Sequence, residues 1–254
     1  MKIRQIVLGA TAALGLLWGA SGSQAEDGVR RLDRCTELFE EERSSFVLVH
    51  NLFSFGLDCL VVNSSNITID LNGFAIIGNG SGKGISASSS VQGVTIRNGT
   101  VRGFAVGISL GGSGNLVEDV HTENNTDTGM FLGAGSVADH VVVQGNWQHG
   151  AILSTAGAIR NSSIRANGNT PASVGVSVGP GGAVTGNTIW ANTGTGLFGS
   201  TGGTVIGNTV MDTIGVGVSV ICPANVQQNT VTANSSGNLS LNGDGCLSVN
   251  NVAP

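Results

Sequence analysis

The sequence repeats itself at a fixed interval. The phrase GNTIWANTGTG at residues 186–196 is followed 21 residues later by GNTVMDTIGVG at residues 207–217. The same interval separates the members of an asparagine column and of a branched apolar column: Asn187, Asn208, Asn229 and Asn250, and Ile189, Val210, Val231 and Val252. Upstream the spacing is looser, and we assign to the position of Ile189 the residues Ile69, Ile96, Val120, Val143 and Ile164. Such a repeat predicts copies of one small unit that bury their apolar faces by stacking.

Each unit contains β-strand patterns. A glycine precedes an alternating stretch at intervals of 21 to 25 residues, at Gly84, Gly107, Gly129, Gly150, Gly175, Gly196 and Gly217, and Asn238 holds the eighth place. After Gly107, for example, the apolar residues Ile108 and Leu110 flank Ser109, which is the pattern of a half-buried strand. We therefore predict an all-β fold, a single-stranded right-handed parallel β-helix of roughly nine coils with a repeat of about 22 residues.

The N-terminus has the features of a secretory signal peptide. Lys2 and Arg4 precede an apolar stretch at residues 6–20, and the small residues Ser23 and Ala25 mark a cleavage site. The apolar stretch is too short to span a bilayer comfortably, and we find no other candidate span. We expect a secreted or periplasmic protein with a signal peptide at 1–25, a small N-terminal cap with the first strands at 26–65, and the β-helix at 66–254.

The cysteines and the charge narrow the choice of compartment and partner. An even number of cysteines in an exported chain predicts disulfides, and their positions favour two local pairs, Cys35–Cys59 and Cys222–Cys246. No CxxC motif accompanies them, which argues against a zinc site, and we expect no cofactor. The net charge of −5 without a cluster of lysine and arginine makes nucleic acid an unlikely partner.

Several stretches near the beginning carry a family resemblance: SSFVLVHNL (44–52), LDCLVV (57–62), NITIDLNGFAIIG (66–78) and GVTIRNGTVRGFAVGI (93–108). They resemble the opening of bacterial exported proteins with parallel β-helix repeats, of the pectin-lyase-like superfold. The resemblance implies that fold, export, and contact with polysaccharide. The paired aspartates of polygalacturonase-like hydrolases, the clustered aspartates of calcium-dependent pectate lyases and the D-P-H-D phrase of alginate epimerases are absent.

One outward row contains the candidate site. Residues that flank the inward Ile189 point outward, because side chains alternate along a strand. The following position gives the row Asp70, Arg97, His121, Gln144, Arg165, Trp190, Met211 and Thr232, and the preceding position adds Asp119. Arginine can bind the carboxylates of acidic sugars, and tryptophan offers an apolar face to a sugar ring. We predict a polysaccharide-binding face formed by Asp119, His121, Gln144, Arg165 and Trp190.

Three functions are compatible with this row. The first is an exported, non-catalytic β-helix that binds polysaccharide or the cell surface. The second is a calcium-independent lyase or epimerase acting on a uronate-containing glycan, with His121, Arg97 and Arg165 as catalytic candidates. The third is a periplasmic metal-handling β-helix, which requires His121, His140 and His149 to converge.

Overall fold

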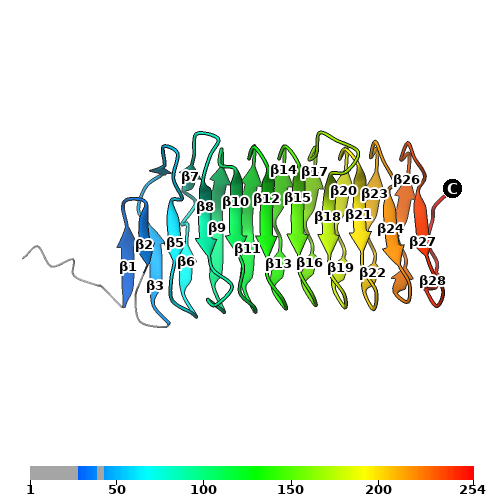
Figure 1. The fold of residues 1–254 in the computed structure, drawn as a ribbon, viewed down its shortest axis with the longest axis horizontal. Helices are drawn as coiled ribbons and strands as arrows, with labels where there is room; N and C mark the ends of the chain where they lie inside the picture. The colour runs from blue at the N-terminus through cyan, green and yellow to red at the C-terminus, as the bar shows by residue number, and fades with distance from the viewer. Residues whose placement is uncertain (1–27, 39–42) are drawn as a thin grey trace, which may run out of the picture.

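The computed structural model describes residues 28–38 and 43–254, and this part of the chain forms a rod of stacked strands without helices (Figure 1). The expected signal peptide at 1–25 lies outside the described residues. The strands form an 18-stranded sheet, here called sheet A, and a 10-stranded sheet, here called sheet B. Strands of successive coils pair in parallel in both sheets, which confirms the predicted parallel β-helix.

Each complete coil contributes two strands to sheet A and one strand to sheet B. The first strands of the coils in sheet A are β1 (Val29–Leu32), β3 (Ser45–Leu48), β6 (Thr68–Asp70), β13 (Val137–Asp139), β16 (Ala158–Arg160), β19 (Ala183–Thr185), β22 (Thr204–Ile206), β25 (Asn225–Gln227) and β28 (Leu247–Val249). The second strands are β4 (Leu52–Phe53), β7 (Ala75–Ile77), β14 (Val142–Gln144), β17 (Ser163–Arg165), β20 (Thr188–Trp190), β23 (Thr209–Met211) and β26 (Thr230–Thr232). Two long strands span both positions: β9 (Thr95–Arg102) and β11 (Leu116–Glu123).

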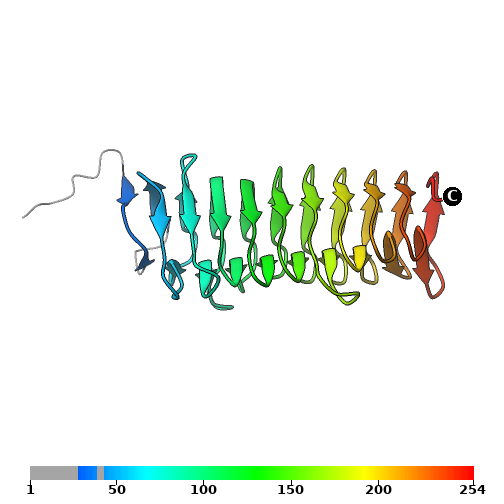
Figure 2. The same ribbon diagram turned by 90° about the horizontal axis from the view of Figure 1, so that it is seen from above.

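Sheet B consists of β2 (Thr36–Leu38), β5 (Leu60–Val62), β8 (Lys83–Ala87), β10 (Val106–Leu110), β12 (Thr128–Leu132), β15 (His149–Leu153), β18 (Val174–Val178), β21 (Thr195–Gly199), β24 (Val218–Ile221) and β27 (Leu239–Asn242). Its ten strands define ten coils, against the roughly nine expected from the repeat. The described residues before 66 continue both sheets, because β1 pairs with β3 and β2 pairs with β5 (Figure 2).

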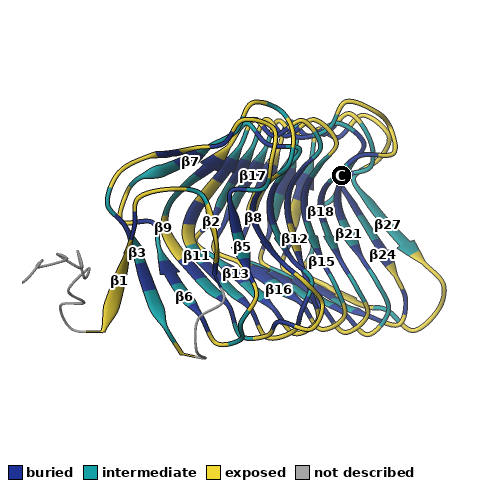
Figure 3. Cartoon of the chain, turned by 60° about the vertical axis from the view of Figure 1, so that its left-hand side comes forward, coloured by how far each residue is buried: buried dark blue, intermediate teal, exposed yellow. Residues whose placement is uncertain are grey.

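The core is a continuous interior built from stacked copies of the same inward positions. Ile164, Ile189, Val210 and Val231 follow one another on successive coils and are completely buried. Their neighbours along the strands face outward, so burial alternates along each strand (Figure 3). Every coil therefore depends on the coils on either side of it for most of its apolar contacts.

The register corrects part of the upstream alignment. Ile69 and Ile96, assigned above to the position of Ile189, lie on the first strand of their coils, whereas Ile189 lies on the second strand. Val120 was assigned to the same position but pairs with Gly99, at the bend between the two halves of β11. The assignment was wrong because both strands of a coil carry an inward branched residue, and spacing alone does not distinguish them.

Asparagine side chains form two ladders inside the corners of the coils. In each ladder the Nδ2 group of one asparagine donates to the Oδ1 atom of the next, at 2.8–3.0 Å. One ladder contains Asn125, Asn146, Asn167 and Asn192, and the other contains Asn187, Asn208, Asn229 and Asn251. The predicted last member, Asn250, is instead a corner residue with a φ of 55°. The final coil is one residue longer, which the constant 21-residue interval could not reveal.

The two local disulfides are confirmed. Cys35 bonds to Cys59 and Cys222 bonds to Cys246, with Cα–Cα distances of 4.4 and 5.0 Å. Each bridge joins residues 24 positions apart, so it links neighbouring coils near one end of the rod. In the part of the chain that the structure describes, no helix is long and apolar enough to cross a membrane.

Candidate functional site

Two rows of outward side chains run along sheet A where its strands end. The first row, on the first strands, contains Asp70, Arg97, Glu118, Asp139 and Arg160. The second row, on the second strands, contains Arg102, Glu123, Gln144, Arg165 and Trp190. Members of a row occupy equivalent positions on successive coils, so neighbours are about 4.8 Å apart. Parallel stacking thus converts residues distant in sequence into two polar lines, one on each side of the corner between the first and second strands.

Hydrogen bonds between coils hold three of the arginines. Each donates from Nε to an acceptor on the preceding coil: Arg97 to Asp70 at 3.0 Å, Arg160 to Asp139 at 2.9 Å, and Arg165 to Gln144 at 2.7 Å. Within the described residues, the Nη groups of these side chains make no hydrogen bond. The guanidinium groups are therefore oriented by the protein, and their paired Nη donors are available to an anion.

The second row forms one connected chain of side chains. Gln144 donates from Nε2 to Oε2 of Glu123 at 2.6 Å, and Gln144 itself accepts the bond from Arg165. The Arg165 guanidinium carbon lies 5.8 Å from the centre of the Trp190 ring, within the range of a cation–π contact. Trp190 remains 37% exposed. The chain of contacts places an oriented arginine beside an accessible aromatic ring.

Asp139 holds two neighbouring side chains. Its Oδ2 atom accepts from Arg160 at 2.9 Å and its Oδ1 atom accepts from Asn161 at 3.0 Å, and Nδ1 of His140 lies 3.0 Å from the same Oδ1 atom. Burial raises the pKa of Asp139, but the hydrogen bonds from Arg160 and Asn161 and the positive charges nearby outweigh this effect and hold the pKa below its usual value. The carboxylate of Asp139 therefore lies beside the His140 ring, within ion-pair distance of Nδ1.

A shallow hollow lies beside this group. Its volume is ≈ 520 Å³, and its lining includes His140, Val142, Ser163 and Thr188. The last three lie on β14, β17 and β20, two residues before the second-row members of the same strands. The hollow therefore borders the second row and combines the imidazole of His140 with the hydroxyl groups of Ser163 and Thr188.

The predicted site residues are only partly brought together. Gln144, Arg165 and Trp190 occupy equivalent positions on three successive coils. His121 is exposed on β11, two residues before Glu123, and pairs across the sheet with Val142. Asp119 is an exposed corner residue with a φ of 53°. It lies outside both rows because the chain bends there.

The proposed catalytic trio does not converge. Arg97 belongs to the first row, next to Asp70 and Glu118, whereas His121 and Arg165 lie on the second strands. His121 and Arg165 are themselves two coils apart, about 10 Å along the rod. This separation corrects the arrangement expected from the sequence, and its cause is the misassigned register of the upstream coils.

The three histidines of the metal hypothesis also lie apart. His121 is on the outer surface of β11, His140 is a corner residue bonded to Asp139, and His149 begins β15 in sheet B. The ring of His149 accepts the backbone N–H of Val174. Among residues 28–38 and 43–254, no group of three histidine, cysteine, aspartate or glutamate side chains is placed to hold a metal ion.

The sequence analysis missed Arg102, Glu123, Asp139 and Arg160, although a signal for the arginines exists. The phrase IRNGTVR at residues 96–102 resembles IRNSSIR at residues 159–165. Each phrase covers the ends of two strand patterns, and each of these patterns ends in an arginine. In the structure these phrases lie three coils apart, at the same two outward positions. They place two arginine pairs about 14 Å apart along the rod, and the two members of each pair lie on either side of a corner of the coil.

Comparison with known proteins identifies structural neighbours at low sequence identity. No protein-family model and no curated protein matches this chain. The A-module of the Azotobacter vinelandii mannuronan C-5 epimerase AlgE4 has a TM-score of 0.62 and 14% identity over 89% of this chain and 86% of that chain. The tailspike protein 2 of bacteriophage CBA120 has a TM-score of 0.63 and 13% identity over 87% of this chain and 42% of that chain.

A third neighbour is the periplasmic alginate epimerase AlgG, with a TM-score of 0.51 and 14% identity over 91% of this chain and 78% of that chain. At this identity the likeness concerns the path of the backbone, because function resides in individual side chains that a fold does not specify. The stacked parallel strands and these neighbours together show that the chain is a right-handed parallel β-helix protein with the pectin-lyase-like fold.

Proposed function

We propose that this protein is an exported, non-catalytic β-helix that binds an acidic polysaccharide along the two rows of sheet A. One observation carries the proposal: an arginine pair on sheet A, Arg97 with Arg102, recurs three coils further along as Arg160 with Arg165. Three of the four are oriented through Nε and keep both Nη groups for a ligand. A guanidinium group oriented through Nε can bind a carboxylate with its two Nη groups.

The spacing of the arginine pairs favours a polymer. The pairs are about 14 Å apart along the rod, so one extended chain can contact both of them. Between them, Glu118 and Glu123 offer carboxylate oxygens that can accept hydrogen bonds from sugar hydroxyls. Trp190 stands at the end of the second row and offers an apolar surface to a sugar ring.

Two further observations support a glycan ligand and export. The structural neighbours include a mannuronan epimerase and a periplasmic alginate epimerase, so this fold accommodates acidic polysaccharides elsewhere. The two disulfides fit an oxidising compartment, which is the periplasm or the extracellular space.

The replacement Arg165→Ala should weaken binding to an acidic polysaccharide by roughly 1.5–3 kcal/mol, about 10- to 150-fold, because it removes a charge-assisted contact. Trp190→Ala should weaken binding to neutral and acidic polysaccharides alike, since the ring contacts the sugar and not its charge. Titration calorimetry with polyuronates and with matched neutral glycans measures both effects.

Arg34→Ala is the matched control for loss of one positive charge, because Arg34 is an exposed arginine that precedes β2 at the N-terminal end of the rod. This control should bind as the unmodified protein does. If Arg34→Ala weakens binding as much as Arg165→Ala, the contribution is one of net charge, and the proposed face is not the binding site.

A second candidate is a calcium-independent lyase or epimerase, favoured by the contacts of Asp139. In this candidate His140 replaces His121 as the base, because its Nδ1 atom lies 3.0 Å from the carboxylate of Asp139. Abstraction of the proton next to a uronate carboxylate leaves negative charge on that carboxylate, and Arg160 lies on the same aspartate to stabilise it. The ring of His121, in contrast, has no carboxylate within ion-pair distance among the described residues.

For this candidate, His140→Ala should abolish formation of unsaturated or epimerised product, with a loss of roughly 100-fold or more, the size expected for a general base. Absorbance of the unsaturated product detects a lyase, and uptake of deuterium from solvent at the sugar carbon detects an epimerase. His121→Ala serves as the paired variant and should retain the activity. Loss of activity in His121→Ala but not in His140→Ala would contradict the assignment of the base.

A further inference from the structure

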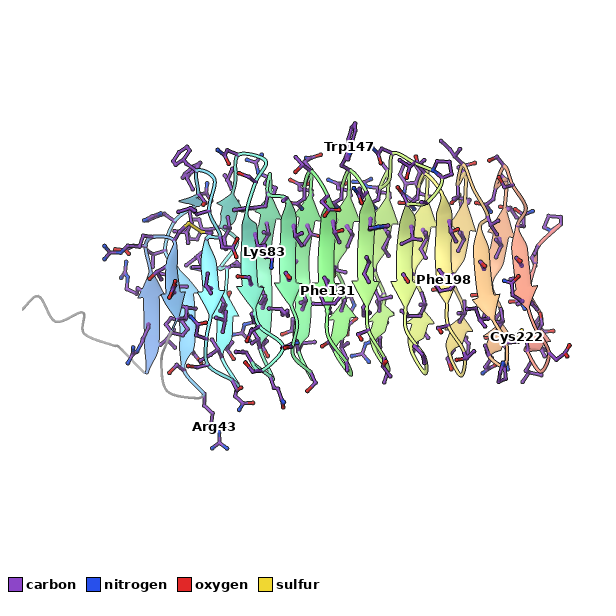
Figure 4. The ribbon with its side chains drawn as sticks, viewed as in Figure 1. Arg43, Lys83, Phe131, Trp147, Phe198 and Cys222 are labelled. Atoms are coloured by element: carbon purple, nitrogen blue, oxygen red, sulfur yellow. A yellow bond between two sulfur atoms is a disulfide. The ribbon has the colours of Figure 1, made fainter. Side chains whose placement is uncertain are left out.

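A tryptophan is exposed at the corner that connects sheet A to sheet B. Trp147 follows β14 and is 60% exposed, and Figure 4 shows its ring projecting from the edge of the rod. On other coils the equivalent corner position, whose N–H donates to the preceding coil, holds Thr126, Gly168, Thr193, Ile214 and Ser235. Threonine, glycine and serine serve at most of these corners, so the fold itself does not require an indole ring here.

A hollow of ≈ 360 Å³ lies beside this ring and is lined by Asn124, Asn125, Thr126, Gly145 and Trp147. Gly145 contributes no side chain, and a Cβ atom there would lie 2.6 Å from Oδ1 of Asn124, so the Asn124 side chain lies over this glycine. In the described part of the chain, the Asn124 side chain makes no hydrogen bond. Its amide is therefore available to a ligand next to the exposed indole ring.

These groups match the chemistry of a sugar. An indole ring offers an apolar surface to the C–H groups of a sugar ring, and an amide can both donate to and accept from sugar hydroxyl groups. Small-molecule sites have volumes of about 300–1,000 Å³ and combine apolar walls with a few polar groups. The hollow, at ≈ 360 Å³, lies at the lower end of this range, which suits one sugar unit and not a long segment.

The charges around the hollow favour an uncharged sugar. None of the residues that line it is ionisable. On the two coils that form the hollow, the charged residues next to it in sequence, Glu123 and Asp127, are both acidic. The second-row arginines Arg102 and Arg165 lie on the coils outside these two. An acidic sugar in the hollow would therefore meet negative charge without a cation in contact, whereas an uncharged sugar would not be repelled.

We propose that the hollow beside Trp147 is a subsite for an uncharged sugar, so that the polysaccharide bound by this protein carries neutral as well as acidic units. This inference rests on the proposed function, because the neutral sugar belongs to the polymer whose carboxylates meet the arginines. Glu123 and Gln144 of the second row directly precede Asn124 and Gly145, so the hollow adjoins that row where the chain turns the corner. One heteropolysaccharide can therefore contact the arginines and Trp147 together.

The chain from residue 26 onward contains two tryptophans, Trp147 and Trp190, and no tyrosine, so its fluorescence reports on these two rings. In the Trp190→Phe variant, all of the tryptophan emission comes from Trp147. Titration with neutral oligosaccharides of glucose, mannose, galactose and N-acetylglucosamine should shift this emission to shorter wavelengths for at least one of them, because a stacked sugar displaces water from the ring. An emission that none of these sugars changes at high millimolar concentration would overturn the subsite.

Trp147→Thr supplies the residue type of the equivalent corner position Thr126 and should weaken binding of the neutral oligosaccharide about tenfold or more. Asn124→Ala supplies the residue type of the equivalent position Ala166, which has a similar positive φ, and should weaken it roughly three- to tenfold. Ile214→Thr, on the same line of corners three coils away, is the matched control and should leave binding unchanged. Equal losses in Trp147→Thr and Ile214→Thr would contradict the subsite.

Calorimetry with oligomannuronate separates this inference from the proposed function. Trp147→Thr should leave oligomannuronate binding unchanged, whereas Arg165→Ala should weaken it. If Arg165→Ala has this effect but no neutral sugar changes the emission of Trp147, the subsite fails and the polysaccharide-binding face stands. If a neutral sugar changes the emission of Trp147 but Arg165→Ala binds oligomannuronate as the unmodified chain does, the subsite is supported and the proposed role of the arginines fails.

Discussion

Gly196→Ala is expected to destabilise the β-helix by about 3 kcal/mol, because the interior has no room for a methyl group there. A Cβ atom at this position would lie 2.6 Å from the carbonyl oxygen of Gly217 on the next coil and 2.9 Å from Oγ1 of Thr213. The same close approach recurs at Gly107, Gly129 and Gly175, each within 2.6–2.7 Å of the next coil's carbonyl oxygen. Urea-induced unfolding followed by circular dichroism measures the loss.

Gly199→Ala, in the same strand β21, is the matched control. The nearest atoms to a Cβ atom there are methyl groups of Val205 and Val220, at 3.4 and 3.5 Å, which is ordinary contact. The equivalent inward position on the neighbouring coils holds Val178 and Val220. The change should therefore be neutral or stabilising by up to about 0.8 kcal/mol, the value of one buried methyl group. Equal destabilisation by both replacements would mean that steric contact between coils is not the cause.

Asn167→Ala should cost about 2–5 kcal/mol, because it interrupts a ladder that is buried along its whole length. Asn167 accepts at Oδ1 from the backbone and side-chain amides of Asn146, and it donates to the backbone oxygen of Val143 and to Asn192. Its removal leaves the backbone N–H of Asn146 without its acceptor in the core. Thermal and urea unfolding report this loss directly.

The reverse change tests the same reasoning. Thr213 follows Asn192 in this ladder, and its hydroxyl is buried without a hydrogen-bond partner. Thr213→Asn would supply an Oδ1 acceptor to Asn192 and should stabilise the protein by about 1 kcal/mol, the net value of one intramolecular hydrogen bond. A neutral or destabilising Thr213→Asn together with a harmless Asn167→Ala would refute the ladder as the source of stability.

Much of the fold followed from periodicity. Each repeat unit has period-two alternation and glycine or asparagine at its corners, and the units follow one another at an interval of 21 residues. Every copy of the unit therefore carries the same structural signals. The interval therefore predicted strands, parallel stacking and the outward position of Trp190. The cysteines were paired correctly because a separation of 24 residues is close to one coil, so each pair meets on adjacent coils.

The candidate site was less predictable, because it depends on register. Each coil has two sheet A strands with the same local pattern, and the strand to which Arg97 or His121 belongs is decided by backbone pairing between coils. The spacing aligned Arg97 with Arg165, but Arg97 belongs to the other strand of its coil. The two residues therefore lie in different rows. Contacts such as that of His140 with Asp139 lie at corners, where the alternation of the strands stops and carries no information.

The sequence by itself determined the repeat, the strands, the two disulfides and the outward face of Gln144, Arg165 and Trp190, because these follow from spacing within one unit or between adjacent units. The tertiary structure alone decided which arginines share a row, where the ladder from Asn125 to Asn192 runs, and that Asn251 ends the other ladder. The physical reason is that hydrogen bonds between coils select one register among several that the apolar pattern permits equally well.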